Sequence, residues 1–202
     1  MNFDNHIYRA LNKYTKSLSV ALGYRDLLTR LHSERVLALS EEIGMRCGLS
    51  ENEFGILKIA ASFHDIGKIG IPDHILLKPA SFEDSEWEVM KQHPIMGEKI
   101  IASTKLEGSH QSALIIRQHH EHYDGLGYPD GLSGDDIPIC SRIIAIADAY
   151  DAMAVTRSYH QARTHSEIME IMRSETGKKF DPHLMHIFSE IIKSSKLKAA
   201  EN

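Results

Sequence analysis

The sequence is poor in cysteine and proline, and it lacks a long uncharged apolar run. Cys47 and Cys140 are too few and too far apart for a disulfide framework or for a zinc site built on cysteines. With 6 prolines and 42% apolar residues, the 202-residue chain resembles neither a fibrous nor a disordered protein. We therefore expect one domain with a substantial core.

Features of membrane and secreted proteins are also missing. No apolar stretch approaches the roughly 20 residues that span a bilayer, and the opening MNFDNHIYRALNK has no secretory signal pattern. We expect a cytoplasmic protein without a membrane contact. The net charge of −5 argues against binding of nucleic-acid polymers, which depends on clustered Lys and Arg. An anionic substrate would need local help, such as a metal ion.

Apolar residues recur at intervals of three and four, which predicts an all-α fold. A first amphipathic helix spans Ile7–Leu22, and Gly23 could end it; a second spans Leu28–Ile43. Ser50 and Glu53 form a capping box that begins a third helix, running toward His64. Further helices are expected at Glu86–Gln92, Ile95–Ser103, Gln111–His120, Cys140–Ala154, Ser166–Arg173 and His183–Ser194.

Two segments rich in Gly and Pro are expected to be loops. One is GKIGIPDHILLKPA, directly after His64 and Asp65. The other is EHYDGLGYPDGLSGDDIP, which follows His119 and His120. Long loops of this kind are more often functional than accidental.

Polar residues interrupt the apolar faces of several predicted helices, and the chain contains 13 histidines. A single buried His is usually a hydrogen-bonded core residue, and Asp151 alone could cap or pair. Several such residues on inward faces cannot easily satisfy one another, and imidazole and carboxylate are donors for divalent metals. The set is His32, His64, Asp65, His93, His119, His120, Asp148 and Asp151.

The order His32, His64-Asp65 and Asp148 resembles the HD-domain metal-dependent phosphohydrolases. The segments HDIGKIGIPDHILLKP, MKQHPIMGEKI, HHEHYDGLGYPDGLSGDDIPICSRI and IADAYDAMAVTRSY resemble, more specifically, the HD-GYP subfamily of bacterial cyclic di-GMP phosphodiesterases. The resemblance runs from about His32 to GKKFDPHL. It implies an all-α HD-domain bundle with the metal site in its core.

The resemblance also implies the ligands of two divalent ions per chain. One ion would be held by His32, His64, Asp65 and Asp148, and the other by Asp65, His93, His119 and His120. Asp65 would then bridge them. Among Fe, Mn, Ni, Co and Zn, which all suit these donors, iron and manganese are the first candidates.

Four further residues have roles by the same resemblance. Lys68 would stabilise the leaving group or help protonate it, acting with Asp65 as the catalytic pair, and Arg157 would bind a substrate phosphate. Tyr128 in the Gly-Tyr-Pro loop and His160 would contact the substrate. Simpler alternatives are a surface charge at a helix end for Lys68, an exposed loop charge for Arg157, and an ordinary tight turn for the Gly-Tyr-Pro loop.

The sequence departs from the family pattern at two places. Leu28 stands where some members have a Glu that binds a third metal, so we expect two ions. The usual RPY followed by a basic residue is RSYH here, with Ser158 and His160, which weakens one phosphate contact. The residues before Leu28 are too few for a sensory domain. We divide the chain into an N-terminal helix, 1–24, for dimer or partner contact, and a catalytic domain, 25–202.

The function expected is hydrolysis of cyclic di-GMP mainly to linear pGpG, with GMP appearing slowly or late. The alternatives are a preference for 3',3'-cyclic GMP-AMP, a module that binds the dinucleotide or a GGDEF-domain protein without cutting, and a phosphohydrolase of mononucleotides. The full set of candidate ligands argues against a module that only binds. His93 with His119-His120 argues against a phosphohydrolase of mononucleotides. The family resemblance suggests GGDEF-domain partners at the Gly-Tyr-Pro loop, and a homodimer stays open.

Overall fold

The computed structural model describes residues 6–155 and 161–201, and every regular element within those ranges is a helix. The all-α prediction is thereby confirmed. The elements in chain order are α1 (His6–Arg25), α2 (Leu27–Gly44), α3 (Glu51–Phe63), the 3₁₀ helix η1 (Ile66–Gly70), α4 (Asp73–Leu76), α5 (Asp84–Met90), α6 (His93–Ala102), α7 (Ser109–Arg117), the 3₁₀ helix η2 (Gly134–Asp136), α8 (Ile139–Ala154), α9 (His165–Ser174) and α10 (Pro182–Ile191).

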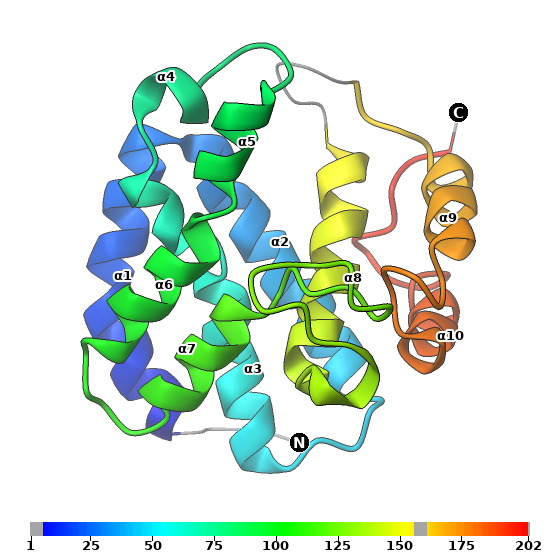
Figure 1. Cartoon of the computed structure of the whole chain (residues 1–202). Coiled ribbons are helices and arrows are strands. Elements are labelled where there is room, and N and C mark those ends of the chain that lie inside the picture. The colour runs from blue at the N-terminus through cyan, green and yellow to red at the C-terminus, as the bar shows by residue number, and fades with distance from the viewer. Residues whose placement is uncertain (1–5, 156–160, 202) are drawn as a thin grey trace.

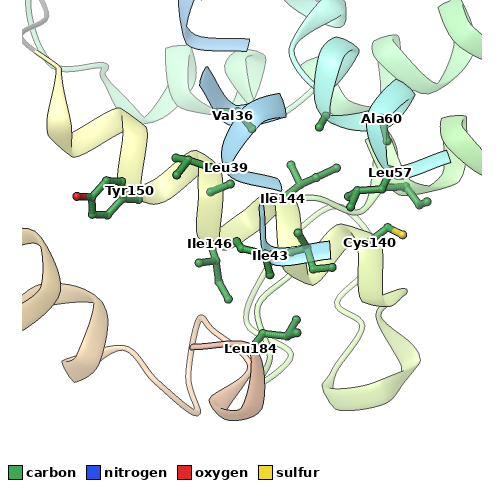
Figure 2. Close-up of a cluster of buried hydrophobic side chains, with 14 of the residues drawn as sticks. Val36, Leu39, Ile43, Leu57, Ala60, Cys140, Ile144, Ile146, Tyr150 and Leu184 are labelled. Atoms are coloured by element: carbon green, nitrogen blue, oxygen red, sulfur yellow. The ribbon is translucent and has the colours of Figure 1, made fainter. Parts of the chain in front are cut away.

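Helices α2, α3 and α8 form the centre of the bundle. In Figure 1, α1, α6 and α7 lie to one side of α2 and α8, and α9 and α10 lie to the other. Helix α2 packs against both α3 and α8, and α6 packs against α7 and η1. Figure 2 shows the resulting core, in which Val36, Leu39 and Ile43 of α2 meet Leu57 of α3 and Ile144 of α8, all of them buried.

Helix starts follow from capping residues in the sequence. The carboxylate of Asp26 accepts hydrogen bonds from the backbone N–H groups of Leu28 and Thr29, which begins α2. The predicted capping box of Ser50 and Glu53 is confirmed at the start of α3. These caps fix where the two helices that reach the candidate site begin.

Two predictions about helix boundaries were wrong. Helix α1 does not end at Gly23 but continues to Arg25, since one Gly costs a helix only about 1 kcal/mol. A Cβ at Gly23 would lie 2.7 Å from Cδ of Arg30, so the glycine allows α1 and α2 to approach. The segment after Asp65 is not all loop, because it forms η1 and, after Pro72, the short α4. Proline is tolerated there because a helix start leaves N–H groups unbonded.

The N-terminal helix contributes to the same core as the rest of the bundle. Leu22 is buried in the main hydrophobic cluster, and Leu18 packs against it. Helix α1 contacts α2, α3 and η1. None of the helices in the described ranges has the length and apolar character needed to cross a membrane.

Candidate metal centre

Five elements place the predicted ligands at one point inside the bundle. Imidazole rings form a continuous series of contacts, with centroid distances of 5.3 Å for His32–His64, 5.2 Å for His64–His119 and 5.1 Å for His93–His120. Helix α7 ends at Arg117, before the predicted end, so the His pair lies in the turn that follows it. The candidate ligands are His32 on α2, His64 and Asp65 after α3, His93 at the start of α6, His119 and His120 after α7, and Asp148 on α8.

The ligand atoms fall into two groups. In each group, three donor atoms from three residues lie within 4.8 Å of one another. This spacing allows one ion to touch all three donors of a group. The groups are His32, His64 and Asp148, and His93, His119 and His120.

Three buried imidazoles are oriented for metal binding by backbone carbonyls. His64 Nδ1 lies 2.9 Å from the carbonyl oxygen of Ala61, and His93 Nδ1 lies 2.8 Å from that of Met90. His119 Nδ1 has the same arrangement, 2.6 Å from the carbonyl oxygen of Ile116. Because a carbonyl only accepts, each Nδ1 carries the proton, which leaves Nε2 with a free lone pair.

Those three Nε2 atoms are buried and have no hydrogen-bond partner within the part of the chain that the structure describes. An unsatisfied buried acceptor is costly, and native proteins rarely leave one without a reason. A divalent ion bound by Nε2 would remove this cost. The residues present therefore fit divalent metal ions, and the donors are those that first-row metals prefer.

Asp65 lies between the two groups. Its Oδ1 is 3.4 Å from Nε2 of His93, in one group. Its Oδ2 is 3.6 Å from Nε2 of His64 and 3.9 Å from Nε2 of His32, in the other. The two oxygens of one carboxylate thus face different groups.

His32 is held by two carboxylates. Its Nε2 lies 2.9 Å from Oδ1 of Asp148, and its Nδ1 lies 2.7 Å from Oδ2 of Asp151. Asp151 is itself bound in a two-pronged contact by Arg35, at 2.6 and 2.9 Å. Asp151 thus orients the ligand His32, a role the sequence did not reveal, although its spacing of three from Asp148 placed it on the same face of α8.

Burial lowers the pKa of His32, but the neighbouring carboxylates outweigh it and raise the pKa above its usual value. Elsewhere the protonation states of the site suit cation binding. Burial lowers the pKa of His93 to about 4 and that of His119 to about 3, so both imidazoles are neutral near pH 7. For Asp65, burial raises the pKa, but Lys68 and the neighbouring histidines outweigh it and hold the pKa well below its usual range. The pKa of Asp148 is also well below its usual range, since hydrogen bonding to His32 outweighs burial. Neutral imidazoles and ionised carboxylates are the metal-binding forms.

A cavity of about 320 Å³ opens beside the two groups. Asp65, Lys68 and Tyr128, which the sequence offers as candidate catalytic and substrate-binding residues, line this cavity. Leu28 also lines the cavity and is 51% exposed. Arg157 and His160, the other predicted substrate contacts, lie outside the described residues.

Arg25 holds the backbone of the segment that carries Lys68. Its guanidinium donates to the carbonyl oxygens of Lys68, Ile69 and Ile71 and to the carboxylate of Asp73. A single side chain at the end of α1 therefore connects the N-terminal helix to η1. The sequence offered no sign of this role, since the partners are more than 40 positions away.

Close backbone contacts explain two of the glycines near the site. A Cβ at Gly67 would lie 1.9 Å from the carbonyl oxygen of His93, so only glycine lets η1 pack against the start of α6. A Cβ at Gly127 would lie 2.2 Å from the backbone N of His122, inside the Gly-Tyr-Pro loop. Both glycines thus bring candidate site residues together.

The Gly-Tyr-Pro loop is held by a buried carboxylate. Glu121 is 3% exposed, and its oxygens accept hydrogen bonds from the backbone N–H groups of Asp130 and Leu132. The Tyr128 N–H donates to the carbonyl of His120, which fixes the loop directly against the candidate metal ligands. The role of Glu121 was not predicted, since a Glu next to a glycine-rich loop is usually exposed.

Comparisons with known proteins agree with this geometry. The family model described as HD domain matches residues 16–184. An HDG"Y"P protein from Bdellovibrio bacteriovorus has a similar fold, with a TM-score of 0.65 at 19% identity, covering 95% of this chain and 67% of that one.

Two curated relatives are similar in sequence. The "Cyclic di-GMP phosphodiesterase response regulator RpfG" of Xanthomonas campestris pv. campestris is 41% identical over 165 residues, which are 82% of this chain and 44% of the relative. The "3'3'-cGAMP-specific phosphodiesterase 2" of Vibrio cholerae is 38% identical over 174 residues, 86% of this chain and 33% of the relative. The chain thus spans less than half the length of these relatives.

Proposed function

The chain belongs to the HD domain family, and on that premise we propose that it is a metal-dependent phosphodiesterase that hydrolyses cyclic di-GMP to linear pGpG. The observation that supports this most directly is the position of Asp65 between two groups of donor atoms. A phosphohydrolase with one metal would need only one such group. The curated relatives whose names give cyclic dinucleotide substrates, and the HD-GYP motifs, support the substrate class.

We assign the ligands as the sequence predicted. One ion would be held by His32, His64, Asp65 and Asp148, and the other by Asp65 with His93, His119 and His120. When bound, two divalent ions would polarise the phosphoryl oxygens and make water a stronger nucleophile near neutral pH. Iron and manganese remain the first candidates.

The chain's own residues would act on the two ends of the reacting phosphodiester. In the first cut, water adds to phosphorus and the bond from phosphorus to the 3' oxygen breaks, which leaves a 5' phosphate and a 3' hydroxyl. Lys68 lines the cavity and carries the ammonium group nearest to Asp65, so it would stabilise the departing oxygen or supply its proton. Arg157, His160 and Tyr128 would hold the rest of the substrate.

A second candidate substrate is 3',3'-cyclic GMP-AMP. A relative with this specificity in its name is 38% identical, close to the value of 41% for the cyclic di-GMP relative. Sequence identity alone does not separate the two substrates. A module that binds without cutting is disfavoured because both donor groups are complete.

The test is anaerobic purification with metal analysis, followed by chromatography of the products. Loaded protein is incubated with cyclic di-GMP, 3',3'-cyclic GMP-AMP and a mononucleotide. Formation of pGpG from cyclic di-GMP supports the proposal. Binding of cyclic di-GMP without any product contradicts it and favours the binding module.

Contacts with other proteins are proposals as well. The Gly-Tyr-Pro loop would meet GGDEF-domain proteins, and the N-terminal helix, 1–24, would serve as a dimer or partner contact beside the catalytic domain, 25–202. We propose a cytoplasmic location, where the protein would encounter cyclic dinucleotides.

A further inference from the structure

An aromatic wall leads from the candidate metal centre toward the outer part of the cavity. The ring of His120 stacks on Tyr128, with centroids 4.9 Å apart and planes at 29°. Tyr128 meets Trp87 edge to face at 6.1 Å, and Trp87 lies nearly parallel to Phe82 at 6.2 Å and 19°. The four rings form a continuous series of ring contacts, which we call the aromatic wall, and no metal-ligand role accounts for its outer two members.

Trp87 remains partly exposed within this arrangement. Its side chain lines the cavity and is 42% exposed, although Phe82 and Tyr128 both contact it. Exposure of so large an apolar ring has a hydrophobic cost of its own. Because Phe82 and Tyr128 fix the indole, little conformational entropy would be lost when a ligand stacks on it.

Leucine side chains also line the cavity. Leu28, Leu76 and Leu77 line it, and Leu28 and Leu77 are both about half exposed, at 51% and 53%. Inorganic phosphate or a small diester would bind at the metal centre and have no use for such surfaces. A substrate with a flat apolar group beyond its phosphate would cover both.

We propose that Trp87 is a stacking site for a base of the substrate, with the indole held in place by its ring contacts with Phe82 and Tyr128. This inference rests on the proposed function, since it assumes that a substrate phosphate lies at the two donor groups. Stacking on an aromatic side chain changes affinity by roughly 5- to 150-fold per base, the equivalent of about 1–3 kcal/mol.

Stacking of this kind tolerates base identity, because every base has a π face. Lys78 also lines the cavity, but its ammonium is paired with Glu86 at 2.5 Å. Neither Asn nor Gln occurs among the described residues that line the cavity, and these amides commonly read the edge of a base. Of the other polar side chains in the lining, Thr29 donates to Asp26 and Lys68 donates to Asp65. The wall therefore favours nucleotides over small phosphodiesters, and it accepts both guanine and adenine.

The single tryptophan of the chain makes a direct test available. Fluorescence of Trp87, excited at its long-wavelength edge, is measured while metal-loaded protein is titrated with GMP, AMP or ribose 5-phosphate. Ribose 5-phosphate has the same phosphate and sugar without a base. We expect GMP and AMP to quench the emission and to protect Trp87 from acrylamide, and ribose 5-phosphate to do neither.

Two substitutions extend the test to cyclic dinucleotides. Trp87→Leu should raise KM for cyclic di-GMP by about tenfold or more with little change in kcat, and Trp87→Phe should restore most of the loss. Leu114→Ala, at a residue that is 41% exposed and absent from the cavity lining, is the control and should change neither constant. Circular dichroism checks that each variant folds.

The results separate this inference from the proposed function. Base-dependent quenching without hydrolysis of any cyclic dinucleotide would preserve the stacking site and contradict the phosphodiesterase. Hydrolysis with an unchanged KM in Trp87→Leu, or equal quenching by GMP and ribose 5-phosphate, would overturn the stacking site alone. Absence of any emission change at millimolar GMP would overturn it as well.

Discussion

The ammonium nitrogen of Lys68 lies 2.7 Å from Oδ2 of Asp65, so the proposed leaving-group residue pairs directly with the carboxylate between the two donor groups. Asp65 is 2% exposed, and a buried carboxylate needs such a partner when no other cation compensates it. Bound divalent ions would take over this compensation. Lys68 would then be available to the substrate.

Lys68→Met tests this relationship. Methionine keeps the length and packing of the side chain without the charge, so we expect metal content to stay at the wild-type level while kcat falls by about 100-fold or more. Elemental analysis and steady-state kinetics measure the two effects. Lys58→Met, which removes the ion-pair partner of Glu41 and lies outside the cavity lining, is the control. Equal kcat values for Lys68→Met and wild type would show that Lys68 is a surface charge without a catalytic role.

Metal content should depend on Asp65 more than on any other single ligand. Wild-type protein should bind two divalent ions per chain, and Asp65→Ala should lose both or nearly both, because its oxygens face both donor groups. His120→Ala should keep the ion at His32, His64 and Asp148. Mass spectrometry of the loaded protein under native conditions counts the ions. One ion in well-loaded wild type would rule out the dinuclear centre.

Metal-free protein should lose stability as the pH falls below about 6.5, the pKa of His in an unfolded chain. Burial lowers the folded-state pKa of His64, His93, His119 and His120, while carboxylates raise that of His32 against burial. Each histidine whose pKa is lowered by folding contributes stability. This contribution is complete above the pKa of the unfolded chain and is lost as pH falls toward the pKa of the folded protein. The slope is about 1.4 kcal/mol per pH unit for each such group, and His32, whose pKa is raised, opposes it only above about 6.5.

Urea unfolding in chelator at pH 7.0 and 5.5 measures that slope. His110→Asn, at an exposed position, should leave the slope unchanged and is the matched control. If the free energy of unfolding is as large at pH 5.5 as at pH 7.0, or larger, the histidine cluster does not require neutral imidazoles.

The products should be dominated by linear pGpG. Leu28 lines the cavity where a carboxylate ligand could otherwise hold a further ion, and an apolar side chain cannot compensate the extra terminal phosphate of pGpG. We expect the first cleavage to outrun the second, and Leu28→Glu to raise the share of GMP. A chromatographic time course follows both products. Leu77→Glu places the same charge elsewhere in the cavity lining and should not raise GMP. GMP formed from the outset without pGpG would contradict the expectation.

Arg25→Ala should reduce turnover without loss of metal. The substitution removes the donors to the carbonyls of Lys68, Ile69 and Ile71, so the segment that positions Lys68 should become less ordered. We expect kcat to fall about tenfold and the free energy of unfolding by about 1–3 kcal/mol. Hydrogen exchange should increase in residues 69–76. Lys16→Ala, exposed on the same helix, should change none of these, and an unaltered exchange rate in Arg25→Ala would refute the positioning role.

Local sequence determined much of this protein. The intervals between apolar residues predicted the helices, and the capping residues Asp26 and Ser50 mark where two of them begin, because both depend on neighbours within one or two turns. The candidate ligands were also visible, since a polar residue within an apolar stripe stands out in one dimension. The order of His32, His64-Asp65 and Asp148 then indicated the family, which the comparisons show.

How the candidate ligands and their partners contact one another depends on the tertiary structure. It determined that Nδ1 of His64, His93 and His119 meets a carbonyl, so that Nε2 faces the centre. It also determined that Asp151 orients His32 from 119 positions away, and that Arg25 reaches a segment more than 40 positions away. Periodicity shows which face of a helix is buried, but it carries no information on which distant element packs against that face. Periodicity is equally uninformative about the surroundings of Trp87. Its sequence neighbours predict a short helix, whereas packing of the whole chain brings it into the cavity that the candidate metal ligands also line.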